Sequence, residues 1–316
     1  MKKFVALLTC GILATTIAAT AMTAMADEEK VWKVGVLYQG LDSPFVIELQ
    51  SAMDALDAER DDIELISLDG LSDAQKQVSQ SEILIEQGVD IIILDGISVE
   101  GCAPCVDNAN KAGIPIFTLI GPTSNQDQCV TLVGSDHAES GRIEMQMIAD
   151  RFDGKCKIAV IEGPLGHSAQ IGRIQGYEEI IANYPDMEIV VQQPADWQRD
   201  VAMSLVENWI QSGVEFDVIA SENDNMALGA VKALEDAGLA DKIPVYGVDG
   251  NDDALEAVKE GRMGGTALQS AKGQAAKSFE IIDMIKDGKI DEIDPLSLVP
   301  FIGVNADNVD EIIANK

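Results

Sequence analysis

The feature that most constrains the fold is a repeated alternation of short apolar runs, rich in β-branched residues, with longer amphipathic stretches. The first half of the chain contains five runs that predict buried strands, at residues 31–38, 63–68, 90–94, 114–119 and 130–134. Helical patterns lie between the first four runs, at residues 45–56, 74–87 and 100–111. Alternation of this kind predicts a parallel, doubly wound α/β sheet with right-handed crossovers.

The same pattern starts again in the second half of the chain. Strand-like runs recur there, with helical stretches between them, at residues 157–161, 187–192, 216–220, 244–248 and 266–268. Two successive α/β runs predict two Rossmann-like lobes of similar design, and a chain of 316 residues is long enough for both.

The N-terminus has the pattern of a cleaved secretory signal. Two lysines precede an apolar run over about residues 4–21, and residues 24–26 form an A-x-A-like processing site. An uncleaved anchor is the alternative, because the run approaches the ~20 residues that span a bilayer. The weakly apolar, Ala/Thr-rich run and its processing site favour cleavage after Ala26 and export to the periplasm. Lipid attachment at Cys10 is not expected, because most of the hydrophobic segment follows it.

Composition excludes several classes of partner. The formal net charge is −32, and removal of a lysine-containing signal makes the remainder more acidic still. Such a surface repels nucleic acid and anionic lipid. Hydrophobic residues make up 47% of the chain, which is enough for a substantial core. We therefore expect a soluble, folded monomer that binds no nucleic acid.

Cysteines and histidines do not form a recognisable metal or redox site. Four cysteines follow the predicted signal, and three complete disulfide pairings are possible among Cys102, Cys105, Cys129 and Cys156. The CxxC formed by the first two has no second CxxC and no nearby histidine, so a local disulfide or two free thiols is the simpler interpretation. His137 and His167 are isolated and lack metal-ligand spacing. We expect no metal and no cofactor.

Polar residues follow several predicted strands. Asp95, Asn223, Asp224 and Asp249 all stand at or just beyond the carboxyl end of an apolar run. Ligands of open α/β sheets bind at this edge. Asp and Asn are also common helix N-caps in such loops, so for each residue capping is an equally good interpretation. Their coincidence at several strand ends favours a binding site.

Five short segments carry a family resemblance through their order and spacing. They are DSPF at 42–45, AGIP at 112–115, QPADW at 193–197, ENDNMALG at 222–229 and GVDG at 247–250. From Val34 to about Val304 the chain resembles the ribose-binding group of periplasmic sugar-binding proteins. The resemblance implies the type I periplasmic binding fold, with two lobes joined by a three-strand hinge near Ser135, Gln269 and Leu298.

The resemblance also implies a ligand site between the lobes. Phe45 and Trp197 match aromatic rings that stack on the ligand, although a tryptophan taken alone is more often a core residue. Arg173 matches a ligand-binding arginine of the second lobe, and its fork can hold two neighbouring hydroxyl oxygens. The residues that match hydroxyl-binding positions are Asn223, Asp249 and Gln269.

Departures from the family pattern argue against ribose as the ligand. Ile120 and Gly121 stand where the family's sugar binders usually carry an Asp-Arg pair, so a charged clamp on the first lobe is missing. Ser43 replaces an asparagine and Val46 a second phenylalanine. A site built to satisfy hydroxyls penalises any group left unpaired.

Nearby residues offer compensation for the missing pair. Asp95 falls at a cleft position that is an asparagine in the ribose binder, and we hypothesise that it supplies the first lobe's carboxylate. His137 falls at another cleft position, and Gln39 and Ser135 are expected to line the same wall.

The resemblance implies the solute-binding component of an ABC importer, with membrane permease subunits as partners and a sugar, polyol or cyclitol as ligand. An acid sugar paired with Arg173 stays open. By the same analogy the lobes comprise residues 27–135 with 270–298, and residues 136–269 with 299–316.

Two alternatives belong to other functional classes. The loaded protein could dock on a chemoreceptor or sensor kinase, because the same binding cycle serves signalling. A carbohydrate-active enzyme is less favoured: Asp95 and Asp249 could mimic a glycosidase pair, but the sequence contains no nucleophile elbow, phosphate loop or metal motif. We therefore expect no enzymatic activity.

Overall fold

The strands form two six-stranded sheets in a computed structural model that describes residues 30–316. The predicted signal peptide, residues 1–26 with cleavage after Ala26, lies outside the described residues. The first sheet consists, in spatial order, of β11 (Leu296–Leu298), β5 (Leu132–Gly134), β4 (Ile116–Ile120), β3 (Ile91–Leu94), β1 (Trp32–Tyr38) and β2 (Ile63–Asp69). The second sheet consists of β12 (Ile302–Val304), β10 (Gly265–Leu268), β9 (Val245–Asp249), β8 (Val218–Ser221), β6 (Lys155–Glu162) and β7 (Asp186–Pro194).

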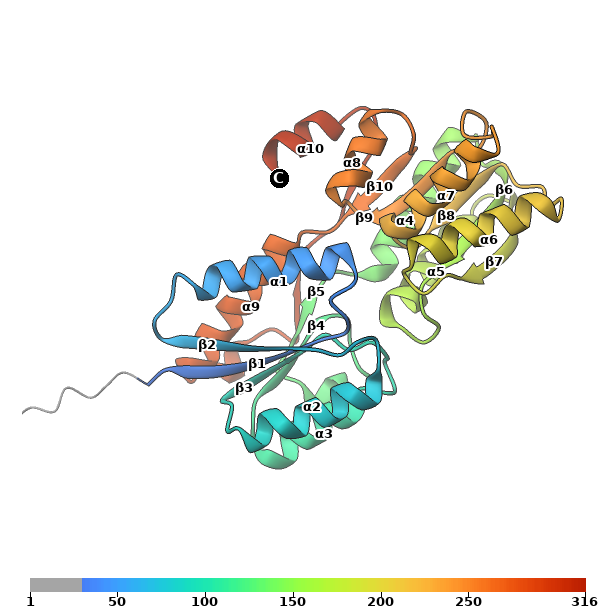
Figure 1. The fold of residues 1–316 in the computed structure, drawn as a ribbon. Helices are drawn as coiled ribbons and strands as arrows, with labels where there is room; N and C mark the ends of the chain where they lie inside the picture. The colour runs from blue at the N-terminus through green and yellow to red at the C-terminus, as the bar shows by residue number, and fades with distance from the viewer. Residues whose placement is uncertain (1–29) are drawn as a thin grey trace, which may run out of the picture. The chain divides into compact units, whose positions relative to one another are not determined.

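Helices cover both faces of each sheet (Figure 1). The first sheet carries α1 (Pro44–Asp57), α2 (Ala74–Glu86), α3 (Ala103–Ala112) and α9 (Ala271–Lys286), and with them forms what we call the first lobe. The second lobe consists of the second sheet with α4 (His137–Arg151), α5 (Ser168–Ile181), α6 (Arg199–Gln211), α7 (Asp224–Asp236), α8 (Asp252–Lys259) and α10 (Val309–Asn315). Two short 3-10 helices complete the described elements, η1 (Gln126–Gln128) and η2 (Ile290–Glu292).

Alternation along each strand explains the two-sided core. In β1, Val34 and Val36 pack in the cluster under α1 and α9, whereas Leu37 packs in the cluster under α2 and α3. The second sheet repeats this in β6, where Ile161 faces α6 and α7 and Val160 faces α4 and α5. Successive side chains of a strand point to opposite faces, so a sheet covered on both sides needs uninterrupted apolar runs.

Strand direction agrees with the predicted class. Every pairing between described strands is parallel except β10 with β12, which is antiparallel. The predicted fold class, two doubly wound α/β lobes, is confirmed. Observed strand ends differ from the predicted ones by one or two residues.

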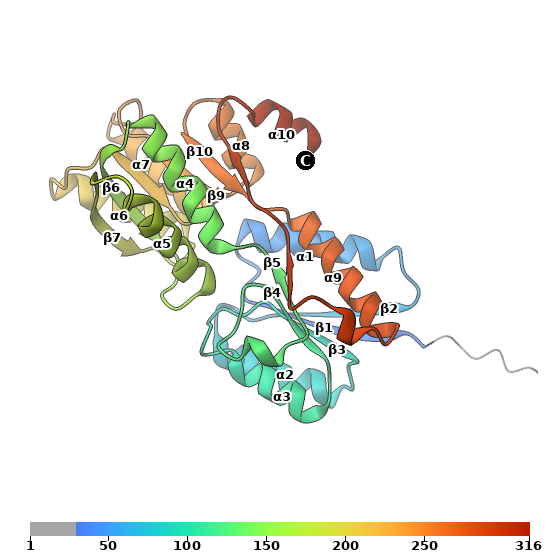
Figure 2. The same ribbon diagram turned by 180° about the vertical axis from the view of Figure 1, so that it is seen from behind.

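Three connections carry the chain between the lobes (Figure 2). The first joins β5 to α4, the second joins β10 to α9, and the third joins β11 to β12. The first and third are tied together, because the Val299 backbone N–H donates to the Gly134 carbonyl at 2.7 Å. The three-strand hinge expected from the resemblance is therefore present.

The cysteines of the described residues are free thiols. Cys102 and Cys105 are buried in the cluster under α2 and α3, and burial raises the pKa of the Cys105 thiol to about 12. Of the two interpretations left open by the sequence, two free thiols is the one observed. Every helix among residues 30–316 is too short or too polar to traverse a lipid bilayer.

Candidate functional site

Arg173 is the centre of a buried polar cluster at the carboxyl end of the second sheet. It projects from α5 and is only 2% exposed. Its Nη1 donates to the carbonyl of Glu222, and its Nη2 lies 3.5 Å from an Asp249 carboxylate oxygen. Its guanidinium carbon lies 5.7 Å from the centre of the Trp197 ring. Predicted residues from three parts of the sequence therefore meet on one side chain.

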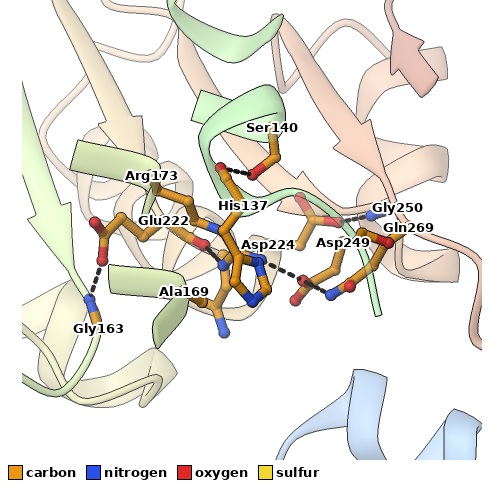
Figure 3. Close-up of polar contacts among 12 residues, drawn as sticks. His137, Ser140, Gly163, Ala169, Arg173, Glu222, Asp224, Asp249, Gly250 and Gln269 are labelled. Carbon is orange, nitrogen blue, oxygen red and sulfur yellow. Dashed lines mark hydrogen bonds and ion pairs between the residues drawn. The ribbon is translucent and has the colours of Figure 1, made fainter. Parts of the chain in front are cut away.

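Asp249 links this cluster to the hinge. Its carboxylate accepts a hydrogen bond of 2.7 Å from Gln269 Nε2 at the second crossing. Gln274 Nε2 lies within hydrogen-bond distance of both Gln269 Oε1 (3.3 Å) and Ser135 Oγ (3.4 Å), and Ser135 is at the first crossing. Burial raises the pKa of Asp249 to about 6, and the charge of Arg173 opposes that shift. Figure 3 shows Arg173, Asp249 and Gln269 gathered in one region.

Asn223 and Asp224 have structural roles that the sequence left open. The Asn223 side-chain oxygen accepts the Met226 N–H at 2.8 Å, so it caps α7. The buried Asp224 carboxylate accepts the Gly250 and Asn251 N–H groups and the Thr266 hydroxyl, at 2.7, 2.9 and 2.8 Å. Asp224 thus fixes the loop that follows Asp249.

Trp197 connects the cluster to the first lobe through His167. The Trp197 and His167 rings meet edge to face with centroids 5.4 Å apart. His167 Nδ1 accepts the Ala169 N–H, so its proton is assigned to Nε2, which lies 2.8 Å from Gln39 Oε1 of the first lobe. Burial and the positive charge of Arg173 lower the pKa of His167 to about 3, so the ring is neutral.

Asp95 lies beside Gln39 and is 1% exposed. One carboxylate oxygen accepts the Gln39 N–H at 3.2 Å, and the Asp95 carbonyl accepts Gln77 Nε2 at 2.8 Å. Burial raises the pKa of Asp95 to about 7, and only hydrogen bonds from Gln39 oppose it. The carboxylate is therefore close to the bridge between the lobes and has no cationic partner recorded among the described residues. Whether it substitutes for the missing pair stays a hypothesis.

His137 is the first residue of α4 and is buried. Neither ring nitrogen forms a hydrogen bond within the described residues. Burial and then the charge of Arg173 lower its pKa well below the ordinary histidine value, and an interaction with the Ile120 backbone opposes that shift. The ring is therefore neutral and presents one donor and one acceptor.

Phe45 and Ser43 lie at the start of α1. Phe45 is 4% exposed and packs in the cluster under α1 and α9, as a core residue does. Ser43 lines a small cavity between the lobes together with Gln39 and Trp197. Contact of Phe45 and Ser43 with a ligand stays a prediction.

Seven non-glycine residues among residues 30–316 have positive φ angles, and three of them, Leu71, Ser72 and Asp153, lie outside the buried polar cluster. Ile120, Asp196, Trp197 and Asp249 have positive φ angles of 66°, 51°, 63° and 127°. Non-glycine residues rarely occupy this region, and such residues gather at functional sites where the surroundings hold them. Three of the four lie next to the predicted ligand groups or are among them.

Several buried polar residues were not identified from the sequence. Glu222 accepts the Gly163 N–H at 2.6 Å, and its other carboxylate oxygen has no partner within the described residues. Glu144 accepts the Tyr177 hydroxyl and the Ser221 N–H, and burial raises its pKa to about 8. The sequence signal that could have identified them is a carboxylate among apolar neighbours, with Glu222 at the end of β8 and Glu144 on α4.

Two larger cavities are lined by residues of both lobes. One of about 500 Å³ is bordered by Asp42, Ser72 and Ile97 of the first lobe and by Pro164 and Gln198 of the second. The other, of about 480 Å³, lies beside the hinge and includes Ser135 and His137. Within residues 30–316, no group of three or more His, Cys, Asp or Glu side chains is arranged to hold a metal ion.

Comparisons with known proteins agree with this architecture. A family model described as periplasmic binding protein domain matches residues 34–290. A xylitol-binding protein of Mycolicibacterium smegmatis is 34% identical over 99% of this chain and 88% of its own length. A putative rhizopine-binding protein of Rhizobium meliloti is 31% identical over 98% of each chain. An ABC transporter solute-binding protein of Bacillus halodurans, solved with bound myo-inositol, is 35% identical with a TM-score of 0.87, covering 92% of this chain and all of the other.

Proposed function

Because the chain belongs to the periplasmic binding protein family, we propose that it is the solute-binding component of an ABC importer, closing its lobes around a small polyhydroxylated molecule. Polyols and cyclitols are favoured within that class. Two relatives of similar length support this choice, one named for xylitol and one solved with myo-inositol. The absence of the Asp-Arg pair at Ile120 and Gly121 speaks against ribose.

The observation that carries the proposal is the convergence of Arg173, Asp249 and Gln269 beside Trp197. The arginine fork donates, the carboxylate accepts, and the amide does both, which is what a ring of hydroxyls requires. An aromatic face nearby suits the C–H face of a sugar or cyclitol. These groups come from α5, the end of β9 and the hinge, so a ligand held by all of them is sensitive to the angle between the lobes.

Closure follows from the placement of the hinge. Hinge closure around a ligand is a known motion of periplasmic binding proteins. A ligand that touches both lobes binds the closed form better and shifts the equilibrium towards it. We propose that the lobes comprise residues 27–135 with 270–298, and 136–269 with 299–316. The proposed ligand contacts are Gln39, Ser43, Phe45, Asp95, Ser135, His137, Arg173, Trp197, Asn223, Asp249 and Gln269.

The wider setting of the protein is part of the same proposal. The matching family model is that of a binding protein and not of a catalytic family. We place the mature chain in the periplasm as a monomer without a cofactor, and its partners are the ligand and the permease subunits.

Calorimetry tests the proposal directly. Xylitol, myo-inositol, D-ribose and D-allose are titrated into the purified mature protein, after a thermal-shift screen with the same compounds. We expect at least one polyol or cyclitol to bind more tightly than D-ribose. Arg173→Gln should abolish that binding, whereas Arg142→Gln, which changes the same charge at an exposed ion pair, should not. Absence of binding by all four compounds, or their chemical conversion by the protein as followed by NMR, would overturn the proposal.

A further inference from the structure

Gly121 stands where the family's sugar binders usually carry an arginine, at the turn after β4. A Cβ built on Gly121 would overlap Ser168 Oγ and would lie 2.8 Å from Ser168 Cβ and 3.4 Å from His137 Nε2. Ser168 and His137 both belong to the second lobe. A side chain at position 121 would therefore enter the space that His137 and the first turn of α5 occupy.

His137 is held firmly in that space. It begins α4 directly after the first hinge crossing, and Asp136 caps the helix by accepting the Ala138 N–H at 3.0 Å. A Cβ on Gly172 would lie 2.6 Å from His137 Cβ, so α5 packs closely against it. A ring fixed by its own helix and by a neighbouring one is preorganised for recognition.

The protein leaves the hydrogen-bonding capacity of His137 largely unfilled, with the Ile120 backbone as the group that interacts with the ring. Both ring nitrogens are buried and unpartnered within the described residues, although the Ile120 carbonyl is nearby. Arg173 Nε and one Glu222 carboxylate oxygen are unpartnered in the same way. Buried polar groups are ordinarily satisfied, so an unpartnered imidazole that lines a cavity indicates a group that a ligand can complete.

We propose that His137 is a specificity-determining residue that takes the place of the missing Asp-Arg pair, meeting a ligand hydroxyl as a neutral imidazole supplied by the second lobe. The inference rests on the proposed function and deepens it. A hydroxyl both donates and accepts, as the imidazole does, so the two are complementary whichever group donates. The ligands predicted by this role are polyols or cyclitols that place a hydroxyl group next to Gly121 when they are bound.

A missing hydroxyl leaves the imidazole unpaired. Sites built around a hydroxyl reject analogues that lack it, because the buried polar group then has no partner. We expect one monodeoxy analogue to bind about 10- to 100-fold more weakly than its parent. In a His137→Phe variant the same deletion should change affinity by less than about threefold, because no imidazole remains to be left unpaired.

The experiment is a protein–ligand double-mutant cycle measured by calorimetry. Wild type, His137→Phe and His137→Asn are titrated with myo-inositol and xylitol and with the monodeoxy analogues of each. His137→Asn retains a donor and an acceptor and should restore part of the discrimination, and His137→Leu, which retains neither, replaces the phenylalanine variant if that variant does not fold. Circular dichroism and melting temperature establish that each variant is folded.

The possible outcomes distinguish the role of His137 from the proposed function of the protein. Binding by wild type, with one analogue whose discrimination collapses in His137→Phe, supports the role of His137. Binding by wild type with equal discrimination in all three proteins overturns that role and leaves the proposed function intact. Failure of wild type to bind either parent compound, together with D-ribose and D-allose, overturns the proposed function and the inference with it.

Discussion

The contact between Gly121 and Ser168 gives a way to obstruct lobe closure without replacing a proposed ligand group. Gly121 follows β4 of the first lobe, and Ser168 opens α5 of the second. The φ angle of Gly121 lies outside the positive region that disfavours side chains, so alanine introduces no backbone strain at this position. The perturbation in Gly121→Ala is therefore a single methyl group placed between the lobes.

The size of the expected effect depends on Ser168 Cβ, which cannot rotate away from the new methyl group. Rotation about χ1 moves Ser168 Oγ away from the new methyl group, but Ser168 Cβ is attached to the helix and would remain 2.8 Å away. Ordinary contact begins several tenths of an ångström beyond that. Overpacking of this kind costs about 1–3 kcal/mol. In the proposed open form the lobes separate Gly121 from Ser168, so the clash is confined to the closed form and the apparent affinity for ligand should fall by the whole amount, about 5- to 150-fold.

The assay is calorimetry with xylitol and myo-inositol, alongside the melting temperature of the ligand-free protein. Ser168→Gly removes both clashing atoms, so Gly121→Ala combined with Ser168→Gly should recover most of the affinity. Gly229→Ala is the matched control, since its methyl group would meet the Arg199 and Met203 backbone inside the second lobe. That control should lower the melting temperature and leave the affinity of the folded protein nearly unchanged. Unchanged affinity in Gly121→Ala, or no recovery in the double variant, would refute the reasoning.

Further predictions concern titration, the first-lobe carboxylate, the thiols and ligand charge. The pKa of Glu144 is raised to about 8 in the folded protein from about 4.5 in the unfolded chain. Its contribution to the free energy of unfolding is therefore fully present below pH 4.5 and is lost as pH rises from 4.5 towards 8. Glu144→Gln should therefore stabilise the protein at pH 8 by on the order of 1–3 kcal/mol and by much less at pH 5, as urea unfolding would reveal; equal effects at both pH values would contradict this. Asp95→Ala should weaken polyol binding at least about tenfold by calorimetry, and an unaltered affinity would reject the hypothesis that Asp95 supplies the first lobe's carboxylate. Dithiothreitol should leave the melting temperature unchanged because the cysteines of residues 30–316 are free; a shift would point to a disulfide. A uronic acid should bind more weakly than the aldose with the same ring hydroxyls, and tighter binding of the acid would oppose the neutral-ligand interpretation.

Patterns that depend on neighbouring residues were predictable from the sequence. Ten of the twelve described strands were located to within a residue or two because a sheet buried on both faces demands continuous apolar runs, as in β3, where all of Ile91–Leu94 is buried. The two edge strands β11 and β12 were not predicted, because each is three residues long and largely exposed. The polar residues at strand ends were also identified correctly as positions, because parallel strands bring their carboxyl ends to one edge.

Pairings between distant residues could not be predicted in the same way. Asn223 was equally consistent with a ligand group and a helix cap, and its side chain forms the cap. Arg173 bonds a backbone carbonyl 49 residues away, and a carbonyl carries no sequence signal. Gly121 was noticed only as a loss, whereas its structural consequence is the close approach of α5. The Asn223 cap and the Arg173 bond lie within the second lobe, and only the Gly121 contact depends on how the two lobes meet. Local periodicity encodes none of the three.

The pairing of Arg173 with Asp249 bears on the acid-sugar alternative. An isolated arginine in a cleft would attract a carboxylate, and the sequence alone left that possibility open. In the structure the guanidinium already faces Asp249 at 3.5 Å, and both side chains are buried. An acidic ligand would bring a second carboxylate beside Asp249, and two like charges in a buried site disfavour each other's ionised forms. A hydroxyl can instead accept from Arg173 and donate to Asp249 without disturbing the pair, so the arrangement favours an uncharged polyol.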